Sequence, residues 1–342
     1  MEIRIAENVD QNNWDSYVMQ HPEGLAYHLY AWKNAVEQAY GYTGAYLLAE
    51  EQGTVHGVLP LIRFKIPFYK PSYISLPYCD AAGPLGDNAD ICEQLLDSAL
   101  TLAQGDRGTC YIRQSVHPEN IAGEGIHKVR MILRLPDSSE ALLNGFKAKL
   151  RSQIRKPTRD GLYVKTGTGE LVDDFYQVFG ENMRDLGSPV HSKKWLEAIM
   201  RFFQEAALMA VVYTAEHVPV AAGIILCHKK TVSIPWASSL REFNRLNPNM
   251  LLYWTFLSHA ADHGYDFFDF GRSTPGEGTY RFKEQWGATP RALHWYDLSE
   301  NKGSESARGA SAKRQIAECV WQKLPVAVAN AFGPLIRKRI SL

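Results

Sequence analysis

Hydrophobic positions in the first part of the chain follow helical and strand-like periods in turn. Leu29, Trp32, Val36 and Ala39 recur at helical spacing, and Gly41 follows them as a stop signal. Two strand-like runs come next, TGAYLLAEE and VHGVLPLIRFK. After a Pro- and Gly-rich stretch, the pattern predicts a helix over ICEQLLDSALTLAQ and a strand over GTCYIRQS. Helices and strands mixed in this way predict an α/β fold class with mixed sheets.

The second part of the chain repeats this order. Residues 191–205 predict a helix, and the strand-like runs ALMAVVYTAEH, PVAAGIILCHKK and TVSIPWASS follow it. The pattern then predicts a helix over NPNMLLYWTFLSHAADHG, closed by Gly264, and a strand over YDFFDFG. The ordered match between the two parts predicts a tandem duplication of one α/β unit.

A boundary between the two repeats is expected at Leu135–Pro136. MILRL is strand-like, and Pro136 with Asp137 and Ser138 supplies a break and a cap for one helix over SSEALLNGFKAKLRSQIRK. After Leu298 the composition becomes small and polar, which is typical of a linker. We therefore expect a first domain at 1–135, a second domain with the motifs at 136–298, a linker at 299–316 and an apolar and basic segment at 317–342.

Composition and charge exclude several function classes. Lys and Arg number 37 against 37 Asp and Glu, and a neutral chain gives no reason to expect DNA binding. The five cysteines form no CxxC pair and the histidines are scattered, so neither disulfides nor a metal site is expected. Signatures of dinucleotide, P-loop, nucleophile-elbow and zinc-hydrolase sites are missing. With no signal peptide or span-length apolar run, we expect a cytoplasmic protein.

The densest candidate for chemistry is DFGRSTPGEGTYRFKEQWGATP, at 269–290. A strand ends at Asp269 and opens into a Gly- and Pro-rich loop, and ligands of α/β sheets bind beyond strand ends. Lys283 lies between Phe282 and Trp286, which would exclude water and strengthen its field. The alternatives are a solvated lysine and aromatic side chains that only pack in the core. The candidate ligand-contacting side chains here also include Arg272 and Tyr280.

A second candidate is the basic stretch FKAKLRSQIRKPTRDG. Arg151 and Arg155 lie four apart on one helix face, and Pro157 is expected to end that helix. Such a pair can grip a phosphate or carboxylate, although a solvated helix face is the alternative. Seven cations stand against one anion in this part of a neutral chain: Lys147, Lys149, Arg151, Arg155, Lys156, Arg159 and Lys165 against Asp160.

Three further residues are candidates for substrate binding. Asn249 follows Asn247 and Pro248 at a helix start, where free N–H groups can seat a pyrophosphate or carboxylate, or where Asn only caps the helix. Tyr78 lies in the loop SLPYCDAAGPLG, which has the composition of a ligand-lining turn or of an ordinary turn. Trp32 is a candidate for contacting the same ligand as Tyr78, and its alternative is packing in the core.

The motifs resemble a known family. YDFFDFGRS followed by GTYRFKEQWGATP resembles the second-domain signature of FemAB-like transferases and the related GNAT-type acyltransferases, and LRSQIRKPTRDG resembles their helix-end motif. The layout of about residues 1–298 resembles their two GNAT-like domains in tandem. The linker and the ending WQKLPVAVANAFGPLIRKRI further resemble the subgroup associated with PEP-CTERM and exopolysaccharide gene clusters.

The resemblance implies transfer of an aminoacyl group from aminoacyl-tRNA to an amine of a peptidoglycan precursor. It implies that Lys283, beside Phe282, lies at the reacting centre, while Asp269, Glu284 or the substrate takes the proton of the amine. The long coiled-coil arm of some tRNA-using relatives is replaced here by a short loop, REFNRLNPN, so acyl-CoA stays open as the donor. No metal is expected.

Three functions follow as hypotheses. The leading hypothesis is an acyl or aminoacyl transferase acting on an amine of a cell-envelope or exopolysaccharide precursor. The alternatives are a CoA-dependent N-acyltransferase of a small amine or amino sugar, and a non-catalytic GNAT-like scaffold in envelope assembly.

The C-terminal segment is apolar with basic residues around it. Its apolar run is interrupted by Pro325 and Pro334 and is too short to cross a bilayer. Trp321 and Phe332 are therefore expected either to dock on the body of the protein, which we favour, or to make peripheral contact with anionic lipid.

Overall fold

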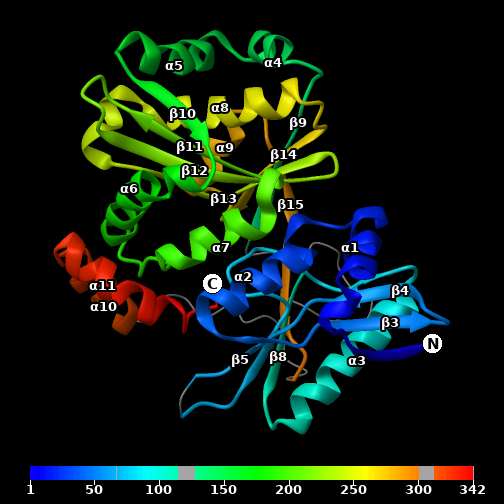
Figure 1. The fold of residues 1–342 in the computed structure, drawn as a ribbon. Helices are drawn as coiled ribbons and strands as arrows, with labels where there is room; N and C mark the ends of the chain where they lie inside the picture. The colour runs from blue at the N-terminus through cyan, green and yellow to red at the C-terminus, as the bar shows by residue number, and fades with distance from the viewer. Residues whose placement is uncertain (67, 115–127, 300–311, 342) are drawn as a thin grey trace. The chain divides into compact units, whose positions relative to one another are not determined.

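The computed structural model describes residues 1–66, 68–114, 128–299 and 312–341. The chain forms two compact units, neither of which is continuous in sequence (Figure 1). Unit 1 comprises Met1–Arg130, Arg291–Gly309 and Arg339–Leu342, and unit 2 comprises Met131–Pro290 and Ala310–Lys338. The domain limits expected at 1–135 and 136–298 assume one continuous stretch for each domain. In the structure, residues 291–298 instead belong to unit 1, and the C-terminal helices belong to unit 2.

Unit 1 contains two sheets. The four-stranded sheet has the order β1 (Glu2–Ile5), β3 (Leu47–Glu51), β4 (Thr54–Leu59) and β7 (Leu85–Gly86). The five-stranded sheet has the order β16 (His294–Asp297), β8 (Thr109–Gln114), β6 (Ser72–Ile74), β5 (Ile62–Phe64) and β2 (Thr43–Gly44). The helical elements are η1 (Asn8–Asp10), α1 (Gln11–Gln20), η2 (Ala26–His28), α2 (Tyr30–Tyr40) and α3 (Ala89–Gly105).

The predicted helix over Leu29–Ala39 is confirmed as α2. It ends at Gly41, whose φ of 70° lies in the left-handed region that glycine adopts without strain. Each of the two predicted strands, however, is divided between the two sheets. VHGVLPLIRFK forms β4 and β5 because Pro60, which cannot donate to a ladder, interrupts the run.

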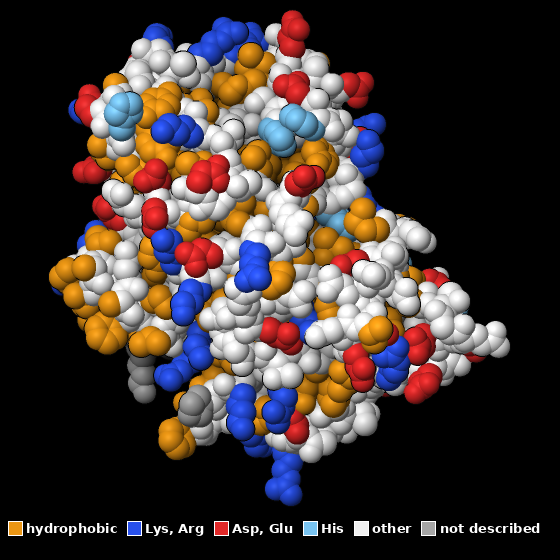
Figure 2. Space-filling view, in the orientation of Figure 1, with side chains coloured by type: hydrophobic (Ala, Val, Ile, Leu, Met, Phe, Trp, Pro, Cys, Tyr) orange, Lys and Arg blue, Asp and Glu red, His pale blue; other side chains and the backbone are white. Residues whose placement is uncertain are grey.

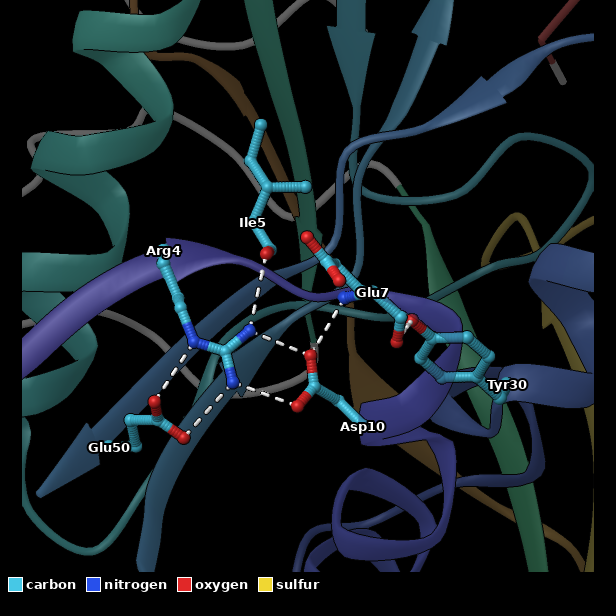
Figure 3. A network of polar contacts seen from close by, with 6 residues as sticks. All are labelled: Arg4, Ile5, Glu7, Asp10, Tyr30 and Glu50. Atoms are coloured by element: carbon cyan, nitrogen blue, oxygen red, sulfur yellow. Dashed lines mark hydrogen bonds and ion pairs between the residues drawn. The ribbon is translucent and has the colours of Figure 1, made fainter. Parts of the chain in front are cut away.

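A charged network joins β1 to η1 and β3 in unit 1 (Figure 3). The Arg4 guanidinium donates to both carboxylate oxygens of Asp10, at 2.7 and 2.8 Å, and to those of Glu50, at 2.9 and 3.2 Å. The Glu7 amide also donates to Asp10, at 2.7 Å. The hydrogen bonds from Arg4 hold the pKa of Asp10 below its ordinary value. The first strand is thus fixed by charge as well as by its sheet.

Unit 2 is organised on one seven-stranded sheet. Its order is β10 (Tyr163–Gly167), β11 (Ala207–Tyr213), β12 (Pro219–His228), β13 (Thr231–Ser239), β14 (Phe267–Ser273), β9 (Val129–Arg134) and β15 (Thr289–Ala292). The helical elements are α4 (Ser139–Gly145), α5 (Ala148–Arg159), η3 (Gly169–Leu171), α6 (Val172–Asp185), α7 (Lys193–Phe203), η4 (Gln204–Ala206), η5 (Arg241–Leu246), α8 (Pro248–Asp262), α9 (Gly278–Glu284), α10 (Ala312–Gln322) and α11 (Val326–Arg337).

The helices of unit 2 cover both faces of its sheet. Helix α8 lies on one face and α6 and α7 lie on the other, while α4 and α5 pack against α8 (Figure 1). The strands and helices predicted from residue 191 to residue 273 are confirmed. Helix α6 was not predicted, although its buried Val172, Phe175 and Phe179 recur at helical spacing.

The helix predicted over SSEALLNGFKAKLRSQIRK is instead two helices. Ser138 caps α4 as expected, its hydroxyl accepting from the Ala141 amide, but the chain becomes extended at Phe146, with ψ at 149°. The expected stop at Pro157 is also wrong, because α5 continues to Arg159. Pro157 removes only its own N–H from the ladder, and the turn closes at Gly161, whose φ is 88°.

The C-terminal helices α10 and α11 dock on unit 2, against α6. Arg184 of α6 donates to the Leu324 carbonyl at 3.0 Å, and the Arg337 guanidinium donates to Nε2 of His191 at 3.0 Å. Ala329 of α11 is buried. The segment is therefore docked, as we favoured, and Trp321 is half-buried, but Phe332, which docking was expected to cover, is 58% exposed. Among the described residues, no helix combines the length and the apolar character that crossing a membrane requires.

Candidate functional site

The sheet of unit 2 opens between β13 and β14. These parallel strands pair only at Thr231 with Phe267, Val232 with Phe268, and Ser233 with Asp269. Strand β13 nevertheless continues to Ser239, and β14 continues to Ser273. Beyond Asp269, the facing edges of the two strands can therefore offer backbone groups to a ligand instead of to each other.

Local sequence explains why the strands separate. The register between β12 and β13 shifts so that Ile234 and Pro235 stand opposite Ile225 alone, which is a β-bulge. Pro235 lacks an N–H and cannot complete a ladder on both sides. On the other strand, Gly271 has a φ of 70° and bends the chain just after the last pair. The bulge in β13 and the bend in β14 therefore turn the two strands away from each other.

Lys283 and Asp269 fix the end of β14 at this opening. The Lys283 ammonium, in a side chain that is only 8% exposed, donates to the carbonyls of Gly271 at 3.1 Å and Arg272 at 2.7 Å. Asp269, 2% exposed, accepts from the Gly271 amide at 2.8 Å. A buried ammonium needs such hydrogen bonds to offset the cost of leaving water. Lys283 is therefore held rigidly at the end of the strand.

A cluster of aromatic side chains from α8, β14 and α9 lies on the α8 face of the sheet. The Tyr253 ring of α8 stacks on Phe270 at 5.6 Å and meets Phe282 edge-on at 5.0 Å. Burial raises the pKa of the Tyr253 phenol far above its ordinary value. Trp286 is buried against Phe146 and Phe282, so it packs as a core residue. Tyr280, also on α9, is half-buried.

On the opposite face of the unit 2 sheet, which α6 and α7 cover, lies a cluster of aromatic side chains that the sequence analysis did not single out. Trp236, on β13 beyond the bulge, meets Trp195 of α7 edge-on at 6.0 Å, and His191 lies 5.9 Å from Trp195. Burial, and then the charge of Arg337, lower the pKa of His191 well below its ordinary value. Ser238 of β13 accepts a hydrogen bond from Asn182 at 3.0 Å. The four-residue spacing of His191 and Trp195, at the start of the helix predicted over 191–205, is the signal that could have drawn attention to them.

The two arginines predicted to grip a phosphate lie in different surroundings. Arg151 is half-buried and donates to the carbonyls of Asn144, at 3.3 Å, and Phe146, at 2.7 Å. It thereby stabilises the joint between α4 and α5. Arg155 is exposed. A forked grip by both side chains stays a prediction.

A cavity of about 860 Å³ lies on unit 2 beside α9. Lys147, Lys149 and Arg281 line it together with Glu284, so cations predominate. Trp286 is among the apolar lining residues. A cavity of this volume accommodates a drug-sized or nucleotide-sized group. Two lysines of the basic stretch, Lys147 and Lys149, therefore line this cavity, whereas Arg151 and Arg155 are not among its lining residues.

The remaining predicted binding residues are placed as follows. Asn249 is half-buried in the first turn of α8, after Asn247 and Pro248, which confirms the helix start. Tyr78, in unit 1, is buried with a φ of 69°, and its amide donates to the Ser341 carbonyl at 2.9 Å. Trp32 is wholly buried and donates to the Pro77 carbonyl at 3.2 Å, so it packs as core. Among the described residues, no His, Cys, Asp and Glu cluster is suited to hold a metal ion.

Comparisons with known proteins agree with this geometry. Residues 144–284, which include α5 to α9 and the opening, match the sequence model of the acetyltransferase (GNAT) domain. No curated protein matches the chain by sequence. Among solved structures, FemX is similar with a TM-score of 0.71 at 17% identity, covering 88% of this chain and 98% of FemX.

Two further solved structures have the same fold. L-PGS from Bacillus licheniformis is similar with a TM-score of 0.57 at 14% identity, covering 94% of this chain and 99% of L-PGS. A tandem GNAT protein from the clavulanic acid biosynthesis pathway is similar with a TM-score of 0.51 at 10% identity, covering 89% of this chain and 99% of that protein. The chain therefore has a mixed α/β, tandem GNAT-like fold, and the GNAT match in its second unit makes it an acyl-transferring enzyme.

Proposed function

We propose that this protein transfers an activated acyl group, aminoacyl groups included, to an amine of a cell-envelope or exopolysaccharide precursor. The observation that carries the proposal is the opening between β13 and β14, with Asp269 and Lys283 fixed at its base inside a matched GNAT domain. The similarity to FemX and to a putative lysylphosphatidylglycerol synthetase from Agrobacterium fabrum supports an aminoacyl group and an envelope acceptor. The C-terminal resemblance to the PEP-CTERM subgroup supports the exopolysaccharide alternative.

The proposed step is nucleophilic attack by the amine nitrogen on the carbonyl carbon of an ester or thioester. A C–N bond forms, and the C–O bond of an aminoacyl ester or the C–S bond of an acyl thioester breaks. The carbonyl oxygen gains negative charge, which the Lys283 ammonium stabilises in water-poor surroundings. Asp269 takes the proton that the amine loses, and the proton passes to the departing oxygen or sulfur.

The backbone at the opening positions the donor. Groups on the facing edges of β13 and β14 can hydrogen-bond an extended acyl chain, in the manner of a strand added to a sheet edge. Holding donor and acceptor together supplies much of the acceleration. Arg151, Arg155, Arg272, Tyr280 and Asn249 are the proposed substrate contacts in unit 2.

A second candidate is CoA-dependent N-acylation of a small amine or amino sugar. The family match itself, to an acetyltransferase domain, favours it. The Asn249 amide, in the first turn of α8, is the proposed contact for a pyrophosphate. The third hypothesis, a non-catalytic scaffold, is not favoured, because it leaves the buried Lys283 and Asp269 without a chemical use.

Identifying the acyl donor that the protein binds and consumes distinguishes these functions. The full chain is melted with aminoacyl-tRNA, deacylated tRNA, acetyl-CoA or CoA, because a ligand at 100 times its Kd stabilises the native state by about 2.7 kcal/mol. Release of tRNA or thiol is then measured with an amino-sugar or peptide-amine acceptor. Turnover with aminoacyl-tRNA supports the leading proposal, and turnover with acetyl-CoA alone supports the second. Binding and turnover of neither donor would leave the scaffold.

A further inference from the structure

The outward face of the C-terminal helices is a second surface with its own chemistry. Helices α10 and α11 use one face to dock on α6: Ala329 and Gly333 are buried, and Gly333 lies against Val190. Glu318 of α10 is half-buried against Gly187. These inward contacts hold the two helices on unit 2, and Trp321 of α10 is also half-buried, whereas several other large apolar side chains of the two helices are left exposed.

Those larger side chains point away from unit 2. Phe332 is 58% exposed and Leu335 is 60% exposed on α11, where Val328 and Ile336 extend the same stripe at helical spacing. On α10, Ile316 is 65% exposed and Val320 is 57% exposed, one turn apart. Figure 2 shows hydrophobic side chains gathered where these helices lie. We call Ile316, Val320, Val328, Phe332, Leu335 and Ile336 the outer stripe.

The outer stripe carries positive charge at its borders. Lys323, exposed, lies between the two helices, and Lys338 follows the end of α11. Glu318 is the sole acidic residue in the sequence from 315 to 338, and it faces inward. Large exposed apolar patches mark contact surfaces, and flanking cations select an anionic partner.

We infer that the outer stripe lies on the surface of an anionic lipid bilayer. The apolar side chains would enter the boundary between headgroups and acyl chains, and the lysines would contact the anionic headgroups. The helices have 11 and 12 residues, shorter than the roughly 20 needed to span a bilayer, so they lie in its plane. A symmetric contact between two copies would bring two cationic borders together, which is unfavourable. The inference does not depend on which acyl donor the enzyme uses.

Co-sedimentation of the full chain with vesicles tests the inference. The vesicles are phosphatidylcholine alone or phosphatidylcholine with about a quarter phosphatidylglycerol. We expect binding to the anionic vesicles that weakens with salt. The double variant Phe332→Ser with Leu335→Ser should bind at least tenfold more weakly, and Lys323→Glu should bind severalfold more weakly. Because these side chains are exposed, both variants should melt at the wild-type temperature.

The matched control is Val9→Ser with Met19→Ser, which removes exposed apolar side chains from unit 1 and should bind as wild type does. Three results would overturn the inference. The first is no sedimentation of the wild type with anionic vesicles. The second is loss of binding in Phe68→Ser, at the fully exposed Phe68 of unit 1, with binding kept in the double variant. The third is a dimer in solution that the double variant dissociates, which would make the outer stripe an interface between copies.

Discussion

Replacing Lys283 by methionine separates its hold on the strand from its proposed part in the reaction. Methionine keeps a long unbranched side chain at this buried position but removes the ammonium. The hydrogen bonds to the Gly271 and Arg272 carbonyls are lost, and hydrogen bonds to charged groups contribute about 1.5–3 kcal/mol each. The variant buries no charge on folding and so avoids the cost of removing an ammonium from water, which offsets part of that loss. We expect a net destabilisation of about 1–3 kcal/mol.

In Lys283→Met, kcat/KM should fall by more than a displacement of β14 alone would cause. Loss of a fixed charge beside the developing oxyanion costs about 2–4 kcal/mol in kcat/KM, or roughly 30- to 1000-fold. Urea unfolding gives the stability and donor consumption gives kcat/KM, with Lys194→Met, at an exposed lysine of α7, as the matched control. Lys283→Arg should recover part of the activity. A folded Lys283→Met protein with wild-type kcat/KM would refute the charge argument.

Three further predictions follow from other contacts. Asp10→Asn should destabilise unit 1 by about 1–3 kcal/mol at neutral pH, because Arg4 loses one of its two carboxylate partners and keeps only Glu50. Since the folded pKa of Asp10 lies below its ordinary 3.8, this contribution is present above that value and is lost as the pH falls through the folded pKa, so wild type and variant should unfold alike in strong acid. Gly187→Ala should loosen the docking of α10 by about 1–3 kcal/mol, since Gly187 has a φ of 74° and an added Cβ would lie 2.9 Å from Glu318; limited proteolysis should cut the variant first in α10 and α11, and an unchanged pattern would contradict the docking. Lys147→Gln with Lys149→Gln should weaken binding of a phosphate-bearing donor, more at low salt than at high salt, whereas equal affinity at every salt concentration would remove the cavity beside α9 from the site.

Local signals in the sequence were sufficient for much of the fold. The helical spacing of Leu29 to Ala39 and the glycine after it specify α2, and the repeated order of elements specifies the tandem arrangement. Where the prediction failed, a single residue redirected the chain. Pro60 divides one predicted strand between two sheets, and the extended backbone at Phe146 divides one predicted helix in two. Neither effect changes the hydrophobic period on which the prediction relied.

The burial of Lys283 could be predicted from the sequence, whereas its contacts could not. The proximity of Phe282 and Trp286 to Lys283 in the chain pointed to a water-poor lysine, and Lys283 is buried. That its ammonium holds the carbonyls of Gly271 and Arg272 depends on how α9 returns to β14, which no short-range pattern encodes. Trp32 could be assigned to the core only when its burial was known, because an aromatic residue at helical spacing is equally suited to a core or to a ligand.

The central claim is that the acyl donor binds between β13 and β14. Hydrogen exchange of the backbone amides of residues 236–239 and 270–273, with and without a saturating donor, tests it most directly. The account predicts that the amides of these segments that do not already hydrogen-bond to a neighbouring strand or to Asp269 exchange at least tenfold more slowly with the donor bound. Amides of unit 1, such as those of Ile91–Ala103 in α3, should stay unchanged. Unchanged exchange in both segments, in the presence of a donor that the protein demonstrably consumes, would contradict it.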